Sequence, residues 1–138
     1  MGYYRHQKKT EEQKRIDNQP KEDFAILAKA KSLLKYTLHQ SSKKDIKAFR
    51  NTVFQEIIKC NVDIIRAVIY ANSHKDNIQE RLKYQNITIQ NCEIMLTLIE
   101  ALLDISIISN HTCEVWSKMC MDIKYMTMAW RKRTAKDK

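Results

Sequence analysis

Glycine and proline are almost absent from this chain of 138 residues, which contains one of each, Gly2 and Pro20. Tight β-hairpins and phosphate-binding loops need glycine, because a backbone with positive φ or in close approach to a ligand leaves no room for a Cβ atom. The sequence after Gly2 therefore argues against those structures. It favours a single domain of long helices joined by short polar turns.

The chain also lacks the sequence motifs of common catalytic and metal sites. It contains no P-loop, no HExxH and no GxSxG motif, and its carboxylates form no evident acid–base pair. His111 and Cys113 are close in sequence, but they diverge on a helix and no second pair of ligands accompanies them. These absences predict a protein that is not an enzyme, binds no metal and needs no cofactor.

A CxxC motif, a signal peptide and a membrane span are missing as well. The most apolar run, "IMLTLIEALLDISII", includes Glu100 and Asp104 and is too short to cross a bilayer. Residues 1–20 are polar and offer no secretory signal. A reduced, cytoplasmic protein without a membrane partner is therefore expected. Its cysteines are predicted to be buried thiols, at Cys60, Cys92, Cys113 and Cys120.

Apolar spacing predicts four helices between a flexible arm over residues 1–21 and a basic tail over residues 132–138. The helices are expected at about 22–40, from Ser42 to about Ala71, after Ser73, and from Ser109 or Asn110. Short turns make neighbouring helices antiparallel, so the predicted fold class is all-α, an up-down four-helix bundle over residues 22–131. The apolar stripes are Phe24, Leu27, Leu34 and Leu38; then Ile46, Val53, Ile57, Ile64 and Val68; then Ile78, Leu82, Gln85, Ile89, Cys92, Leu96, Ile99 and Leu103; and finally Thr112, Trp116, Met119, Ile123, Met126 and Trp130.

The second predicted helix carries a further apolar track beside its main stripe. An apolar surface that wide either lies at the centre of a bundle or faces another subunit, and periodicity leaves both possibilities open. The candidate subunit-interface residues on this track are Phe54, Ile58, Ile65 and Ile69.

Positive charge is abundant, with 25 Lys and Arg against 16 Asp and Glu and a formal net charge of +9. Such a balance suits a polyanionic partner. Lys43, Lys47 and Arg50 share one helix face, where like charges repel by roughly 0.2–0.5 kcal/mol per pair, and a bound anion would remove that penalty. A solvated lysine-rich turn is the alternative. The candidate contacts to nucleic acid or polymerase are Lys29, Lys31, Lys35, Lys43, Lys44, Lys47, Arg50, Arg131, Lys132 and Arg133.

Arg131, Lys132 and Arg133 directly follow Trp130. Cations at a helix C-terminus offset its partial negative charge, but one or two are enough for that purpose. The excess predicts that the tail contributes to binding rather than to folding.

The tract "SNHTCEVWSKMCMDIKYMTMAW" resembles the last helix of the accessory variability determinant (Avd) proteins of diversity-generating retroelements. Ser109, Trp116 and Trp130 occupy the serine and tryptophan positions of that family. The stretches "ALLDISIIS" and "KAFRNTVFQEIIKCNVDIIRAVIYAN" resemble its third and second helices, so the likeness covers about residues 24–131. The chain departs from the family at "QSSKK", where Phe-Pro-Lys is frequent, at "TMAW", where Gly-Gly often precedes the tryptophan, and at Cys113, where an aromatic residue is usual.

This resemblance implies a non-catalytic accessory protein that forms a homopentameric barrel with a basic surface. Such a protein binds the element's reverse transcriptase, template RNA and cDNA during mutagenic reverse transcription. The related proteins encoded in 23S rRNA intervening sequences share the same bundle. The alternative is therefore an oligomeric interaction protein of that type, without a polymerase partner.

Overall fold

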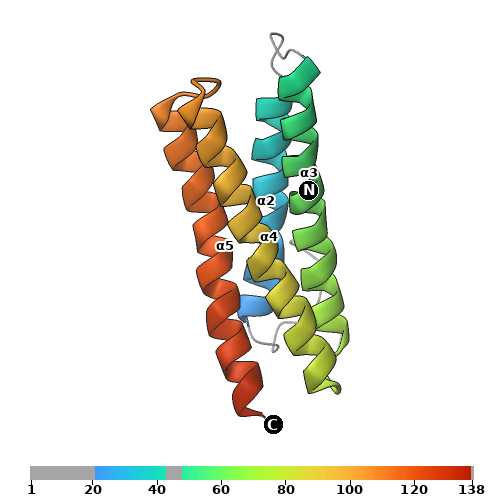
Figure 1. Cartoon of the computed structure of the whole chain (residues 1–138). Helices are drawn as coiled ribbons and strands as arrows, with labels where there is room; N and C mark the ends of the chain where they lie inside the picture. The colour runs from blue at the N-terminus through green and yellow to red at the C-terminus, as the bar shows by residue number, and fades with distance from the viewer. Residues whose placement is uncertain (1–20, 43–47, 138) are drawn as a thin grey trace, which may run out of the picture.

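The computed structural model describes residues 21–42 and 48–137. These two stretches contain four α-helices and no strand: α2 (Lys21–Ser41), α3 (Ala48–Ser73), α4 (Ile78–Asp104) and α5 (Asn110–Lys136). Helix α2 packs against α3 and α5, and α4 packs against the same two helices, so the four surround one core (Figure 1). The predicted all-α, up-down four-helix bundle is confirmed. The predicted arm over residues 1–21 lies outside the described residues except for Lys21, with which α2 begins, and the predicted start of the second helix at Ser42 is followed by residues 43–47, which also lie outside them.

Side-chain caps begin the last two helices. The Asn77 side chain accepts a hydrogen bond from the backbone N–H of Glu80 at 3.1 Å, and Ser109 accepts one from Thr112 at 3.1 Å. Each bond satisfies an N–H group that has no partner inside the helix. The predicted start at Ser109 or Asn110 is confirmed, whereas the helix predicted after Ser73 begins only at Ile78. Helix α3 continues through Ser73, whose hydroxyl donates to the Ile69 carbonyl at 2.9 Å.

Helix α4 ends with a left-handed residue although no glycine is available. Ser106 has a φ of 60°, a conformation that usually falls to glycine. Its N–H donates to the Leu103 carbonyl at 2.9 Å, and the Ile107 N–H donates to the Leu102 carbonyl at 2.9 Å. These two bonds satisfy terminal carbonyls, and Ile107 packs against the core, so the turn is stabilised without glycine.

A chain of buried polar contacts joins three helices at the level of Trp116. The indole Nε1 of Trp116 donates to Thr37 Oγ1 at 3.0 Å, and Thr37 Oγ1 donates to Asn61 Oδ1 at 3.1 Å. Asn61 Nδ2 donates to the Ala30 carbonyl at 3.3 Å. All four residues are fully buried. Each bond contributes about 1 kcal/mol net, and a partner left unpaired would cost more than that.

Apolar side chains surround these contacts, and they include a residue that was predicted to face another subunit. The Phe54 ring stacks on Trp116 with ring centroids 6.0 Å apart, and Phe54 is only 3% exposed. Its assignment to a subunit interface is therefore wrong, because the Trp116 ring of α5 covers Phe54 inside the core. The predicted stripe on α5 is confirmed for Trp116, Ile123 and Trp130, which are all buried.

The buried face of α2 differs from the predicted one. Leu38 is 46% exposed, and Leu27 and Leu34 are half-buried. The predicted buried face was chosen by its large apolar side chains, whereas the face of α2 that contacts α3 and α5 also contains small and polar residues. The buried residues of α2 are Ile26, Ala30, Leu33, Thr37 and Gln40.

Helix α5 continues to Lys136, so the predicted basic tail from residue 132 is wrong over the described part. Thr134 is 5% exposed, and its Oγ1 accepts a hydrogen bond from Gln85 Nε2 at 2.9 Å. The same hydroxyl donates to the Trp130 carbonyl at 3.1 Å. Arg131 Nη1 donates to Asn86 Oδ1 at 2.7 Å. These contacts hold the last turns of α5 against α4.

We therefore expect a chain that ends at Trp130 to be destabilised, contrary to the expectation from sequence. Removing Thr134 leaves the buried Gln85 amide without its acceptor, which costs about 1–3 kcal/mol and lowers the melting temperature by roughly 5 °C or more. Thermal unfolding followed by circular dichroism measures the effect. A chain that ends at Asp137 is the control, and equal melting temperatures for the two truncations would contradict the structural role of Thr134.

Candidate nucleic-acid interface

A group of six cations lies on the residues at the end of the bundle where α5 finishes and α4 begins, and Figure 1 shows these two helix ends. Cations in the last turn of α5 lie where the helix dipole favours them. The hydrogen bonds from Gln85 to Thr134 and from Arg131 to Asn86 hold α5 against α4 there. We call this surface the basic end, and it consists of Lys75, Arg81, Arg131, Lys132, Arg133 and Lys136.

A pocket opens in the basic end, and we call it the end pocket. It lies between the turn after α3, the first turns of α4 and the last turns of α5. The Arg81 guanidinium lies over the Trp130 ring, with Cζ 5.1 Å from the ring centroid. Four cations and one carboxylate around a concave surface favour an anionic ligand. The residues lining the end pocket are Lys75, Arg81, Trp130, Arg133, Thr134, Lys136 and Asp137.

The structure separates the cations that the sequence grouped together. Lys35 lies within one turn of Thr37, which is level with Trp116. Arg131 follows Trp116 by about four turns of α5, roughly 22 Å along the axis. Lys35 and Arg131 therefore lie on separate surfaces.

The outcomes for the individual predicted cations differ. Lys29, Lys31 and Lys35 are exposed on α2, and Lys29 Nζ lies 3.8 Å from Asp122 Oδ2 of α5. Lys132 and Arg133 are exposed, and Arg131 is half-buried. The remaining candidates lie outside the described residues or have side chains that the structure does not describe: Lys43, Lys44, Lys47 and Arg50.

Sequence reasoning missed Lys75 and Arg81, and it placed Lys136 in the basic tail without naming it as a contact. The stretch 75–107 carries more acids than cations, so counting its net charge as a whole hid the first two. All three cations of that stretch lie within its first nine residues, and a narrower window would have found them. Nothing in the sequence places them beside Arg133, because that proximity comes from the packing of α4 on α5.

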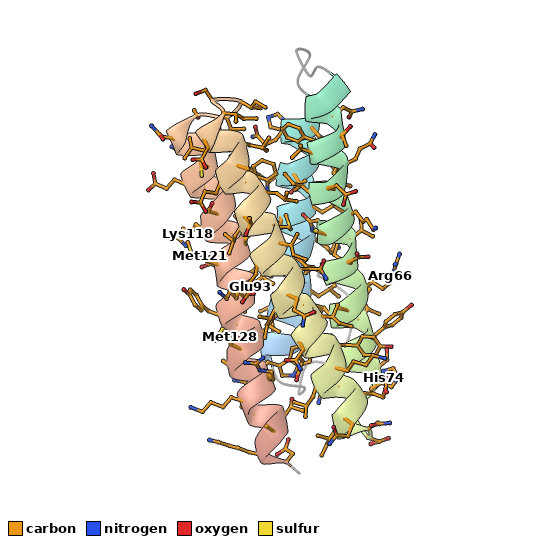
Figure 2. The ribbon with its side chains drawn as sticks, in the orientation of Figure 1. Arg66, His74, Glu93, Lys118, Met121 and Met128 are labelled. Atoms are coloured by element: carbon orange, nitrogen blue, oxygen red, sulfur yellow. The ribbon has the colours of Figure 1, made fainter. Side chains whose placement is uncertain are left out.

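A stripe of exposed apolar side chains runs along α5. Met121, Tyr125 and Met128 are 36%, 60% and 38% exposed, and their spacing puts them on one helix face. In Figure 2, Lys118, Met121 and Met128 follow one another along α5, beside Glu93 of α4. Leu82 of α4 lines a shallow hollow together with Met128. We call Met121, Tyr125 and Met128 the α5 apolar stripe.

The α3 track offers less apolar surface than was predicted. Besides the buried Phe54, Ile58 and Ile65 are half-buried, and only Ile69, at 44%, is well exposed. The spacing of Met121, Tyr125 and Met128 is as visible in the sequence as that of the α3 track. Only the core stripe of α5, which includes Trp116 and Trp130, was predicted from the sequence, and a second apolar stripe on this helix was not.

Three of the cysteines are buried in the core. Burial raises the pKa of the Cys92 thiol to about 12, and burial raises the pKa of the Cys120 thiol further. Burial, together with Asp63 and Glu56, also raises the pKa of Cys60. These thiols stay protonated at neutral pH and are poor nucleophiles and metal ligands. Across residues 21–42 and 48–137 no cluster of three or more His, Cys, Asp or Glu is arranged to hold a metal ion, and no helix combines the length and apolarity needed to cross a membrane.

The raised thiol pKa values predict a loss of stability in alkaline solution. An unfolded chain ionises its cysteines near pH 8.5–9, whereas the folded chain keeps Cys92 protonated up to about pH 12. Between these values the folded state binds more protons, so the free energy of unfolding falls as pH rises. Urea unfolding at pH 7, 8 and 10 measures the trend. Cys92→Ala with Cys120→Ala should flatten it, and an unchanged slope in that variant would contradict the assignment.

Comparison with known proteins supports the fold. No family model matches the chain, and no curated protein matches its sequence. The structure is similar to the crystal structure of a protein of unknown function from the S23 ribosomal protein family of Bacteroides thetaiotaomicron, with a TM-score of 0.73 and 12% sequence identity. The match covers 80% of this chain and 98% of that one. At this identity the likeness shows a shared fold, so the chain has the four-helix fold of that S23-family protein.

Proposed function

We propose that the protein is a non-catalytic accessory subunit that binds nucleic acid and the reverse transcriptase of a diversity-generating retroelement. The basic end carries this proposal. Lys132, Arg133 and Lys136 are exposed in the last turns of α5, and no carboxylate among the described residues pairs with them. A helix C-terminus needs only one or two cations to offset its dipole. The remaining charge is available to a polyanion.

The rigidity of the basic end adds to this support. Because Gln85 and Asn86 hold the last turns of α5, the cations project from a fixed helix surface instead of a flexible tail. A fixed array of cations loses little conformational entropy when it contacts a series of phosphates. This arrangement suits a subunit that holds RNA and cDNA in place beside a polymerase.

The retroelement role rests on the resemblance to the Avd family, in the order and spacing of four helices. A second candidate function is an oligomeric interaction protein of the 23S rRNA intervening-sequence type, and the fold shared with an S23-family protein favours it. The genomic surroundings separate the two. A neighbouring reverse transcriptase reading frame with paired template and variable repeats supports the first, and a location inside a 23S rRNA gene supports the second.

Removing the unpaired cations of the basic end is expected to weaken RNA binding and its salt dependence. In the triple variant Lys132→Gln, Arg133→Gln and Lys136→Gln, each lost phosphate contact lowers the slope of log K against log salt by about 0.7 for single-stranded RNA. The slope should therefore fall by about two units. Fluorescence anisotropy of a labelled RNA at several KCl concentrations measures it.

The matched control removes the same charge elsewhere. Lys59, Arg66 and Lys118 are exposed on α3 and α5, and Figure 2 shows Arg66 and Lys118 away from the basic end. Arg66 and Lys118 form surface ion pairs with Asp63 and Asp122, and such pairs contribute little to stability, so Gln at all three positions should leave the fold intact. Equal changes in slope for the two triple variants would show that the basic end has no special role.

We also propose that the protein assembles into the homopentamer that the resemblance implies, with the α5 apolar stripe in the subunit contact. Light scattering should give about five times the chain mass of 16.4 kDa. Met121→Glu with Met128→Glu places charges in that contact and should release monomers. Leu38→Glu, at another exposed apolar position, should leave the assembly unchanged. A clean wild-type monomer at micromolar concentration would refute the assembly.

A further inference from the structure

The two tryptophans of the chain differ in their hydrogen bonding. The Trp116 indole N–H donates to Thr37 inside the core. Trp130 is only 3% exposed, yet its indole N–H finds no acceptor among the described residues. This N–H is not one of the fully buried groups that lack a partner, so it keeps access to water or to a ligand.

Trp130 forms part of the wall of the end pocket, where the other polar groups are mainly cations. Lys75, Arg133 and Lys136 have no carboxylate within ion-pair distance among the described residues. The Thr134 hydroxyl is already used, because it donates to the Trp130 carbonyl and accepts from Gln85. Apart from the Asp137 carboxylate, the groups left for a ligand are hydrogen-bond donors, so they favour a ligand that brings acceptors and negative charge.

We propose that the end pocket binds a phosphate monoester, with the Trp130 N–H donating to one phosphate oxygen and Arg133, Lys136 and Lys75 balancing the charge. We assign this monoester to the terminal phosphate of an RNA strand, and this assignment rests on the proposed function. A monoester carries about −1.5 to −2 charges on three free oxygens, which suits several cations around one concave surface. An internal phosphodiester carries one charge and must bring chain on both sides.

The dipole of α5 disfavours an anion in the end pocket, whereas the cationic side chains favour one. The larger of these two effects decides whether a phosphate binds. The C-terminus of α5 carries a partial charge of about −0.5. Asp137 adds one carboxylate, against three cations in the pocket wall besides Arg81, namely Lys75, Arg133 and Lys136. The local charge therefore stays clearly positive, and a phosphate dianion is attracted.

The indole signals provide a direct test, since the chain has two tryptophans and one serves as the control for the other. In a ¹⁵N–¹H correlation spectrum, inorganic phosphate added at constant ionic strength should shift the Trp130 indole signal and leave that of Trp116 in place. The variant Trp130→Phe assigns the two signals by removing one. If both signals move, or neither, the pocket does not bind phosphate and the proposal is wrong.

The strand end is tested with oligoribonucleotides of one sequence that carry a 5′-phosphate, a 3′-phosphate or only hydroxyl ends. One phosphorylated form should bind about tenfold more tightly, as expected for one additional charge-assisted contact. Trp130→Phe and Arg133→Gln with Lys136→Gln should abolish this preference. The matched variant Lys132→Gln with Lys118→Gln removes equal charge outside the pocket and should retain it.

The outcomes separate this inference from the proposed function. If all three oligonucleotides bind equally well, nucleic-acid binding stands and the assignment to a strand end is overturned. If none binds while phosphate still shifts Trp130, the proposed function fails and the phosphate site stands with a free phosphate compound as its ligand.

Discussion

The hydrogen bond between Trp116 and Thr37 sets the register of the whole bundle. It joins α5 to α2, the first and last of the described helices, and continues through Asn61 into α3. Sliding α5 by one turn, about 5.4 Å, would bury the Trp116 indole N–H without its acceptor. Apolar packing alone penalises such a slip less, because apolar contacts are not directional. The buried polar chain therefore decides which residues of α5 reach the basic end.

The hydrogen bond between Gln85 and Thr134 fixes the last turns of α5 in the same register against α4. The sequence from residue 132 was predicted to be a basic tail, but up to Lys136 it is a helix that packs on α4. The cations of the basic end are consequently positioned by the core, and their geometry is part of the fold. A mobile tail could attract a polyanion, but it could not shape a pocket around Trp130.

Prediction from sequence succeeded where local signals decide the structure. The four helices, the cap at Ser109 and the buried positions of Trp116 and Trp130 follow from apolar spacing and capping chemistry. It failed for α2, because the buried Thr37 is polar and its burial depends on a partner 79 residues away. Phe54 was misplaced for a related reason. A wide apolar surface on α3 does not reveal whether an aromatic ring from α5 or another subunit covers it.

The sequence by itself determined an all-helical chain, because scarce glycine and proline leave few turns and the apolar spacing follows the helical period. It also determined a basic protein suited to an anionic partner. Only the tertiary structure decided which cations lie close together at the end pocket. Lys75 and Arg81 lie in a stretch whose net charge is negative, and they join Arg133 and Lys136 because α4 begins where α5 ends. Charge counted along a chain cannot show this, since electrostatic interaction depends on distance in space.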